Sequence, residues 1–207
     1  ALEIAMPKPL EAGDIDIKLG VTWISPKIIQ QFIYETLNTP SYLQDRRYNS
    51  ENSIKVEFSP LNAEWNISNK NADRNNIIAN SSFGTEKRNA YHLIEDCLNM
   101  RSTKITKKVT RDGKEVTVTD TEATELAQEK QKDLQSAFKE WIFQDSQRRE
   151  EIVNQYNVIF NSSKPREYDG SHLKFVGMNA EIKLMEHQKN AVAHALYGGN
   201  ALFAHEV

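Results

Sequence analysis

The clearest local pattern in this chain is a β-hairpin followed at once by a long helix. In ITKKVTRDGKEVTVTD, β-branched residues alternate with charged or polar ones from Ile105 to Val118, and Asp112-Gly113 supplies the positive φ angles of a tight turn. Thr119 and Glu122 then have capping-box spacing. A helix to about residue 144 is expected, because apolar residues recur at helical spacing: Leu126, Leu134, Phe138, Trp141 and Ile142.

The rest of the sequence adds a second hairpin and further helices. Ser25-Pro26 has the pattern of a helix start, and Thr39-Pro40 is expected to stop that helix. Alternation over residues 54–58 and 65–67, across a turn at 59–62, predicts the other hairpin. Helices are also expected at about 85–99 and 147–161. The predicted class is therefore α+β, with two β-hairpins and about five helices.

Composition and charge limit the cellular compartment and the kinds of partner expected for this chain. The 207 residues carry a net charge of −3, which argues against a protein whose whole surface coats nucleic acid. No apolar run reaches the length of a membrane span. Cys97 is the single cysteine, so the sequence predicts a cytoplasmic protein without an internal disulfide. We interpret Cys97 as a small residue of the core. Arg148-Arg149, next to Glu150-Glu151, is interpreted as a solvated charged face.

The hairpin expected at residues 105–118 is basic although the chain is acidic. Its cations outnumber Asp112 and Glu115, and they are candidates for contacts to DNA phosphates: Lys104, Lys107, Lys108, Arg111 and Lys114. The alternative is that lysines protect an exposed strand edge from aggregation. No aromatic residue that could stack on a base interleaves with these charges. Both interpretations remain open at this point.

The C-terminal stretch has the features of an approach to a nucleotide site. In LMEHQKNAVAHALYGGNALFAHEV, a helix carries Gln188, Gly198-Gly199 follows, and residues 201–204 are expected to form a short apolar strand. A glutamine amide can pair with adenine, because it offers a donor beside an acceptor. The phosphate loop G-x-x-x-x-G-K-S/T does not occur in the sequence. The alternative is a polar residue on an exposed helix face followed by a glycine C-cap.

Two longer stretches carry a family resemblance. FNSSKPREYDGSHLKFVGMNAEIKLMEHQKNAVAHALYGGNALFAHEV, from Phe160, and MPKPLEAGDIDIKLGVTWI, from Met6 to Ile24, resemble parts of very large bacterial proteins encoded on conjugative and other mobile elements. Those proteins join an adenine-specific DNA methyltransferase to a Snf-type superfamily-two helicase. The most distinctive matches are Trp23-Ile24, Arg166 and the run 168–172.

The resemblance implies a place between two catalytic modules. Residues 1–164 would be an accessory domain, and residues 165–207 the start of the helicase ATP-binding domain, a helix–strand fragment of a RecA-like α/β fold. The chain would then end just before the phosphate-binding loop. Its partners would be DNA and the neighbouring methyltransferase and motor domains, and the exposed C-terminal strand could self-associate. The alternative is a structural adaptor that joins the two modules without touching DNA.

The resemblance also implies roles for individual residues. Gln188 would read adenine, and Tyr168 or Phe175 would stack on the ring. ATP and Mg²⁺ would bind only to the intact parent, an ATP-dependent helicase or translocase. For this chain alone we expect no catalytic residue, no cofactor and no enzyme activity. No metal site is expected either, because the spacing of His187, His194 and His205 shows no ligand pattern.

Overall fold

The computed structural model of this chain describes residues 7–44, 52–111, 114–164, 166–179 and 181–203, without the side chains of Arg111 and Lys114. The chain divides into two compact units. The larger unit is Pro9–Ile159, and the smaller unit combines Ala1–Lys8 with Phe160–Val207. Each unit is described by itself. The predicted domain boundary at residues 164 and 165 stays a prediction, and it lies close to this division.

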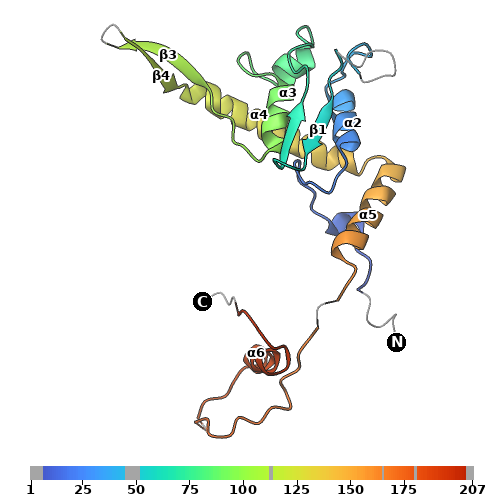
Figure 1. Cartoon of the computed structure of the whole chain (residues 1–207), viewed down its shortest axis with the longest axis vertical. Coiled ribbons are helices and arrows are strands. Elements are labelled where there is room, and N and C mark those ends of the chain that lie inside the picture. Colours follow the sequence, from blue (N-terminus) through green and yellow to red (C-terminus); the bar gives the residue numbers. More distant parts are fainter. Residues whose placement is uncertain (1–6, 45–51, 112–113, 165, 180, 204–207) are drawn as a thin grey trace. The chain divides into compact units, whose positions relative to one another are not determined.

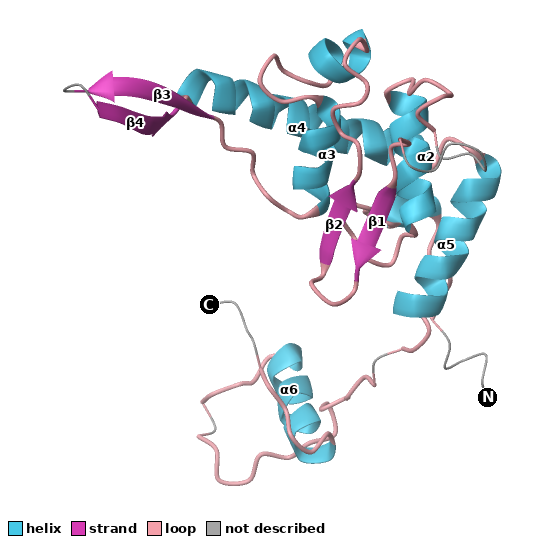
Figure 2. Ribbon diagram, turned by 45° about the horizontal axis from the view of Figure 1, so that its top comes forward, coloured by secondary structure: helices cyan, strands magenta, loops and turns pink. Residues whose placement is uncertain are grey.

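The larger unit mixes helices with two small antiparallel sheets, so the α+β class is confirmed (Figures 1 and 2). Its regular elements, in chain order, are η1 (Ala12–Asp14), α2 (Pro26–Thr36), β1 (Val56–Ser59), β2 (Glu64–Ile67), the π-helical turn η2 (Ile78–Ser82), α3 (Ala90–Leu98), β3 (Thr106–Arg111), β4 (Lys114–Thr119), α4 (Thr121–Ile142) and α5 (Ser146–Phe160). The smaller unit contains α6 (Glu186–Tyr197). No helix within the described residues combines the length and the apolar character needed to cross a bilayer.

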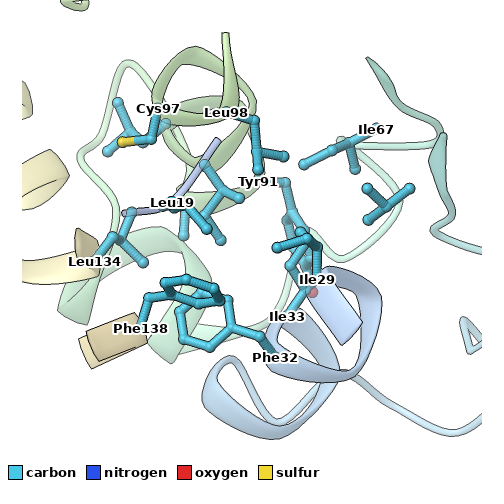
Figure 3. Packing of buried hydrophobic residues seen from close by; sticks show 14 of the residues in the cluster. Leu19, Ile29, Phe32, Ile33, Ile67, Tyr91, Cys97, Leu98, Leu134 and Phe138 are labelled. Atoms are coloured by element: carbon cyan, nitrogen blue, oxygen red, sulfur yellow. The ribbon is translucent and has the colours of Figure 1, made fainter. Parts of the chain in front are cut away.

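Helix α4 is the element around which the larger unit packs. It contacts both α2 and α3, while β1 packs on α2 and β2 packs on α3. Phe32 of α2 meets two aromatic rings of α4 edge-on: Phe138 at a centroid distance of 5.1 Å and Trp141 at 5.4 Å. Figure 3 shows Phe32 and Phe138 facing each other beneath Leu134 and Leu19. Because these side chains come from α2, α4 and the N-terminal segment, the core ties distant parts of the sequence together.

The N-terminal segment enters this core as an extended chain without a strand partner. Ile15, Ile17 and Leu19 are buried, whereas Asp16 and Lys18 between them are exposed. Gly20 then turns the chain with φ at +106°, and a Cβ there would lie 2.6 Å from the carbonyl oxygen of Leu98. Only glycine fits both the backbone angle and this close approach to the end of α3.

Local signals predicted the first helix and the first hairpin. Helix α2 begins at Pro26 after Ser25, and its apolar stripe is buried as expected. It ends at Thr36, earlier than the proline at position 40 suggested, since Asn38 adopts φ at 49°. Strands β1 and β2 pair with Val56 opposite Ile67 and Phe58 opposite Trp65. The hairpin therefore has one buried face and one open face.

The predicted start of the third element was wrong. A helix was expected from about residue 85, but α3 begins at Ala90 with Asn89 as its N-cap, whose side chain accepts a hydrogen bond from the N–H of His92. Residues before it form η2 and a tight turn in which Thr85 bridges Arg88. Ion pairs hold this turn, since Arg88 contacts Asp96 at 2.8 Å and Lys87 contacts Asp120 at 2.6 Å.

The predicted capping box of α4 was also wrong. The N-cap is Asp120, one residue after Thr119, and no side chain caps the helix. The Asp120 carboxylate instead binds two lysines, Lys87 at 2.6 Å and Lys107 at 3.4 Å. Leu126, expected in the core, is 46% exposed, and Ala127 and Gln131 of the same helix are buried.

Two expectations about α5 need correction. Arg148 is not part of a solvated face: it is 8% exposed and donates hydrogen bonds to the carbonyl oxygens of Trp141 and Ile142. In α5, Ile152 is buried as expected, whereas Ile159 and Phe160 are exposed.

The apolar strand expected at 201–204 is not formed over residues 201–203, which are irregular and exposed. Ala204 lies outside the described residues.

Candidate functional site

The basic hairpin is formed by β3 and β4, and it extends clear of α2, α3 and β1 (Figure 1). The register places Lys108 opposite Thr117 and Val109 opposite Val116. Side chains alternate along a strand, so the two faces differ in chemistry. One face carries four threonines with the Lys108–Glu115 pair: Thr106, Thr110, Thr117 and Thr119. The other carries Lys107 with three valines: Val109, Val116 and Val118.

The lysines of the hairpin are exposed and only weakly held. The Nζ of Lys108 lies 3.2 Å from the carboxylate of Glu115, and these side chains are 74% and 68% exposed. Lys107 contacts Asp120 at 3.4 Å, and Lys104 is exposed before β3 begins. Exposed ion pairs contribute at most about 1 kcal/mol, so a phosphate can replace the carboxylate at little cost. Arg111 pairs with Lys114 next to the turn, and their side chains lie outside the description.

Asp120 fixes the base of the hairpin to the start of α4. Its backbone N–H donates to the carbonyl oxygen of Ile105 at 2.8 Å, and the N–H of Ile105 donates to Oγ1 of Thr124 at 3.0 Å. The ammonium groups of Lys87 and Lys107 hold the pKa of the Asp120 carboxyl below its usual value. The hairpin is therefore anchored at one end while its strands remain open on both faces.

The smaller unit places Tyr168 against α6. The Tyr168 ring stacks on His194 with centroids 4.6 Å apart and planes 14° apart, and the Arg166 guanidinium lies 5.0 Å from the Tyr168 centroid. A hydrogen bond of 2.8 Å from the N–H of Gly170 to Oδ1 of Asn190 holds the loop on the helix. A shallow cavity of about 280 Å³ results, and it is lined by Arg166, Tyr168, His187, Asn190, Ala191, His194 and Phe203.

Gln188 lies outside the lining of this cavity. Its Oε1 accepts a hydrogen bond from the backbone N–H of Met185 at 2.9 Å, which closes a capping box at the start of α6. An amide oxygen has two lone pairs, so this bond leaves one for another donor. Phe175 does not line the cavity either. Of the residues predicted to read adenine, the structure therefore brings only Tyr168 to the cavity.

The residues present do not form a complete ATP site. The sequence contains no G-x-x-x-x-G-K-S/T motif, whose backbone N–H groups and lysine would bind the phosphates. Adenine could stack on Tyr168 only by displacing His194 or Arg166, which lie against this ring. The contribution of His194 was not predicted, although His187, Asn190 and His194 have the spacing of one helix face. Among the described residues no three His, Cys, Asp or Glu side chains group as a metal site would require, and His205 lies outside them.

Replacing Gly170 by alanine should detach the loop from α6. A Cβ at this position would lie 2.0 Å from the carbonyl oxygen of Lys189, which no small shift relieves. We expect the ring-current shift that Tyr168 imposes on the His194 imidazole protons to be lost in NMR spectra. Gly13→Ala is the control, because no atom lies within 4 Å of its added Cβ. An unchanged His194 resonance in Gly170→Ala would contradict this packing.

Comparison with known proteins gives one match. The family described as a domain of unknown function (DUF8437) matches residues 18–162. This range holds most of the core, the basic hairpin and helices α2 to α5. No curated protein and no solved structure matches the chain. Because the match covers more than half of its residues, the chain belongs to the DUF8437 family.

Proposed function

We propose that this chain is the DNA-contacting accessory part of a larger ATP-dependent DNA helicase or translocase. The observation that carries the DNA contact is the β3–β4 hairpin, which extends from the core and exposes lysines on an acidic protein. Of these, Lys108 is held only by an exposed ion pair, which contributes little stability.

The hairpin has the chemistry of a backbone-reading ribbon. A two-stranded β-ribbon fits the major groove of DNA, which is about 12 Å wide. Threonine hydroxyls on one face can donate to phosphate oxygens, and lysines neutralise phosphate charge. The residues offered are Lys104, Lys107 and Lys108, with Arg111 and Lys114 at the turn. Contacts of this kind bind DNA without reading its sequence.

The link to a helicase rests on the resemblance of the C-terminal stretch. Supporting it, Tyr168 lies against α6, the helix that carries Gln188. In the intact parent Gln188 would contact adenine, while phosphates and Mg²⁺ would be held by residues that this sequence does not contain. The parent would be a bacterial mobile-element protein of the cytoplasm that also carries a DNA methyltransferase.

A second function is favoured by one observation on the smaller unit. Several of its large apolar side chains are exposed, with Val176 at 96% and Leu202 at 92%. Exposed apolar groups gathered on one unit are typical of a surface that contacts another protein. The chain would then be a structural adaptor between the methyltransferase and the motor.

Charge reversal on the hairpin tests the DNA contact. We expect the chain to retard a duplex in a gel at low salt, with a retardation that weakens steeply as salt is raised. Lys107→Glu with Lys108→Glu should weaken binding by about tenfold or more, since two phosphate contacts become repulsive.

The matched control is Lys27→Glu with Lys174→Glu, which changes the net charge equally at exposed positions outside the hairpin. It should lose much less affinity. Equal losses in the two double variants would show that the hairpin is not the contact. A chain that retards no duplex at low salt would favour the adaptor.

A further inference from the structure

The larger unit contains a second basic feature, which is a cavity of about 570 Å³ beside α4. Its lining includes four cations and no carboxylate: Lys18, Arg101, Lys132 and Lys139. Leu19, Cys97 and Met100 provide an apolar part, and three glutamines of α4 complete much of the wall. We propose that this cavity binds a phosphate-bearing ligand of about the size of a nucleotide.

The cavity is built by buried contacts that fix its walls. Gln131 of α4 is buried, and its Oε1 accepts a hydrogen bond from the N–H of Thr103 at 3.0 Å. Its Nε2 donates to the carbonyl oxygen of Arg101 at 3.0 Å and lies 3.6 Å from Sγ of Cys97. The loop after α3 is thus held on α4. Figure 3 shows two residues of this lining, Cys97 and Leu19, among the buried side chains of the core, on the same side of it as Leu134 of α4.

The charges of the lining favour an anion. Lys139 contacts Asp16 at 2.5 Å, and Arg101 contacts Glu64 at 2.6 Å, but both pairs are more than half exposed and their carboxylates stand outside the lining. Such pairs contribute little, so both cations can also bind an incoming anion. Lys18 and Lys132 are exposed at the same cavity and add two more positive charges.

Cys97 does not oppose this charge. Burial raises the pKa of its thiol to about 11, so the group is neutral at physiological pH. A charged thiolate is therefore absent from the cavity wall under those conditions.

The size and the mixed lining point to a phosphate ester. Sites for small molecules have volumes of roughly 300–1,000 Å³, and this cavity lies within that range. Lysine and arginine bind phosphate through charge-assisted hydrogen bonds. Leu19 and Met100 offer apolar surface to a base or another uncharged part. The same chemistry belongs to a free nucleotide and to the phosphorylated end of a DNA strand.

The inference does not depend on the proposed DNA contact, because no residue of β3 or β4 lines the cavity. It is tested on the full chain carrying Lys107→Glu and Lys108→Glu, so that hairpin binding does not contribute. The probes are ADP without metal and an eight-nucleotide thymidine strand with a 5′ phosphate. Binding is measured by titration calorimetry and by the NMR shifts of the side-chain amides of Gln128 and Gln135, which line the cavity.

The side-chain amides of Gln128 and Gln135 belong to the wall of the cavity, so their NMR resonances report on this site. We expect at least one probe to bind and to shift these resonances in proportion to the occupied fraction. A shift with ADP alone identifies a free nucleotide, and a shift with the strand alone identifies a DNA end. A shift with both supports the shared phosphate chemistry.

Lys18→Glu with Lys132→Glu should weaken that binding by about tenfold or more, because charge-assisted hydrogen bonds are lost. Both side chains are exposed, so the thermal unfolding midpoint should hardly change. Lys27→Glu with Lys174→Glu is again the charge-matched control. The inference is wrong if neither probe binds or shifts the amide resonances of Gln128 and Gln135, or if the two double variants behave alike.

Discussion

Phe138→Ala should lower the free energy of unfolding by about 3–5 kcal/mol, the range for large-to-small changes of a buried aromatic residue. The Phe138 side chain is fully buried and packs edge-on against Phe32. It also stacks on Trp141 of its own helix at 6.3 Å. Alanine would leave a cavity where α2 and α4 meet, and the surrounding helices cannot collapse to fill it.

Urea denaturation followed by circular dichroism measures this effect. Leu126→Ala is the matched control, because Leu126 lies on the same helix but is 46% exposed. Its cost should be within about 0.5 kcal/mol, as for most surface substitutions. Equal destabilisation by the two variants would contradict the packing of α4 described above.

Arg148→Ala should cost about 2–3 kcal/mol, although a surface arginine normally costs little. The guanidinium donates to the carbonyl oxygens of Trp141 at 2.7 Å and Ile142 at 3.2 Å. It also lies 3.5 Å above the centre of the Trp141 ring. Alanine would remove this cation–π contact and would leave carbonyls at the end of α4 without their charged donor.

The adjacent residue provides the control for this second prediction. Arg149 is exposed and donates to the carbonyl oxygen of Phe143 at 2.9 Å. Arg149→Ala should therefore cost less than about 1 kcal/mol in the same denaturation measurement. Arg148→Lys should recover only part of the stability, since lysine lacks the planar fork that reaches two carbonyls and a ring. Similar losses at positions 148 and 149 would show that the buried contacts of Arg148 contribute little.

Local patterns were enough to predict elements whose causes are local. Helix α2 followed from its proline start and apolar stripe, and both hairpins followed from alternation around turn residues. Asp120 replaced Thr119 as the N-cap because Lys87, far away in the sequence, supplies a partner for its carboxylate. Arg148 looked like a solvated charge because nothing in the sequence shows that it lies over Trp141.

The candidate sites also differ in whether their residues are close together in the sequence. The basic character of the hairpin was predicted because four lysines and one arginine follow one another between residues 104 and 114. The cavity beside α4 was not predicted, since Lys18, Arg101 and Lys132 belong to three separate segments that only the fold brings together. Tyr168 was singled out through a family resemblance, and its partner His194 only through the structure.

Helix α4 connects the basic hairpin to the basic cavity. The hairpin is anchored at its N-cap, Asp120, and the cavity lies along the same helix from Gln128 to Lys139. At 1.5 Å per residue, Lys132 and Lys139 lie about 18 and 28 Å along the axis from Asp120. Adding or removing one residue of α4 between Asp120 and Gln128 would turn the cavity by about 100° relative to the hairpin. The number of helical residues between the hairpin and the cavity therefore sets both their distance and the directions in which they face.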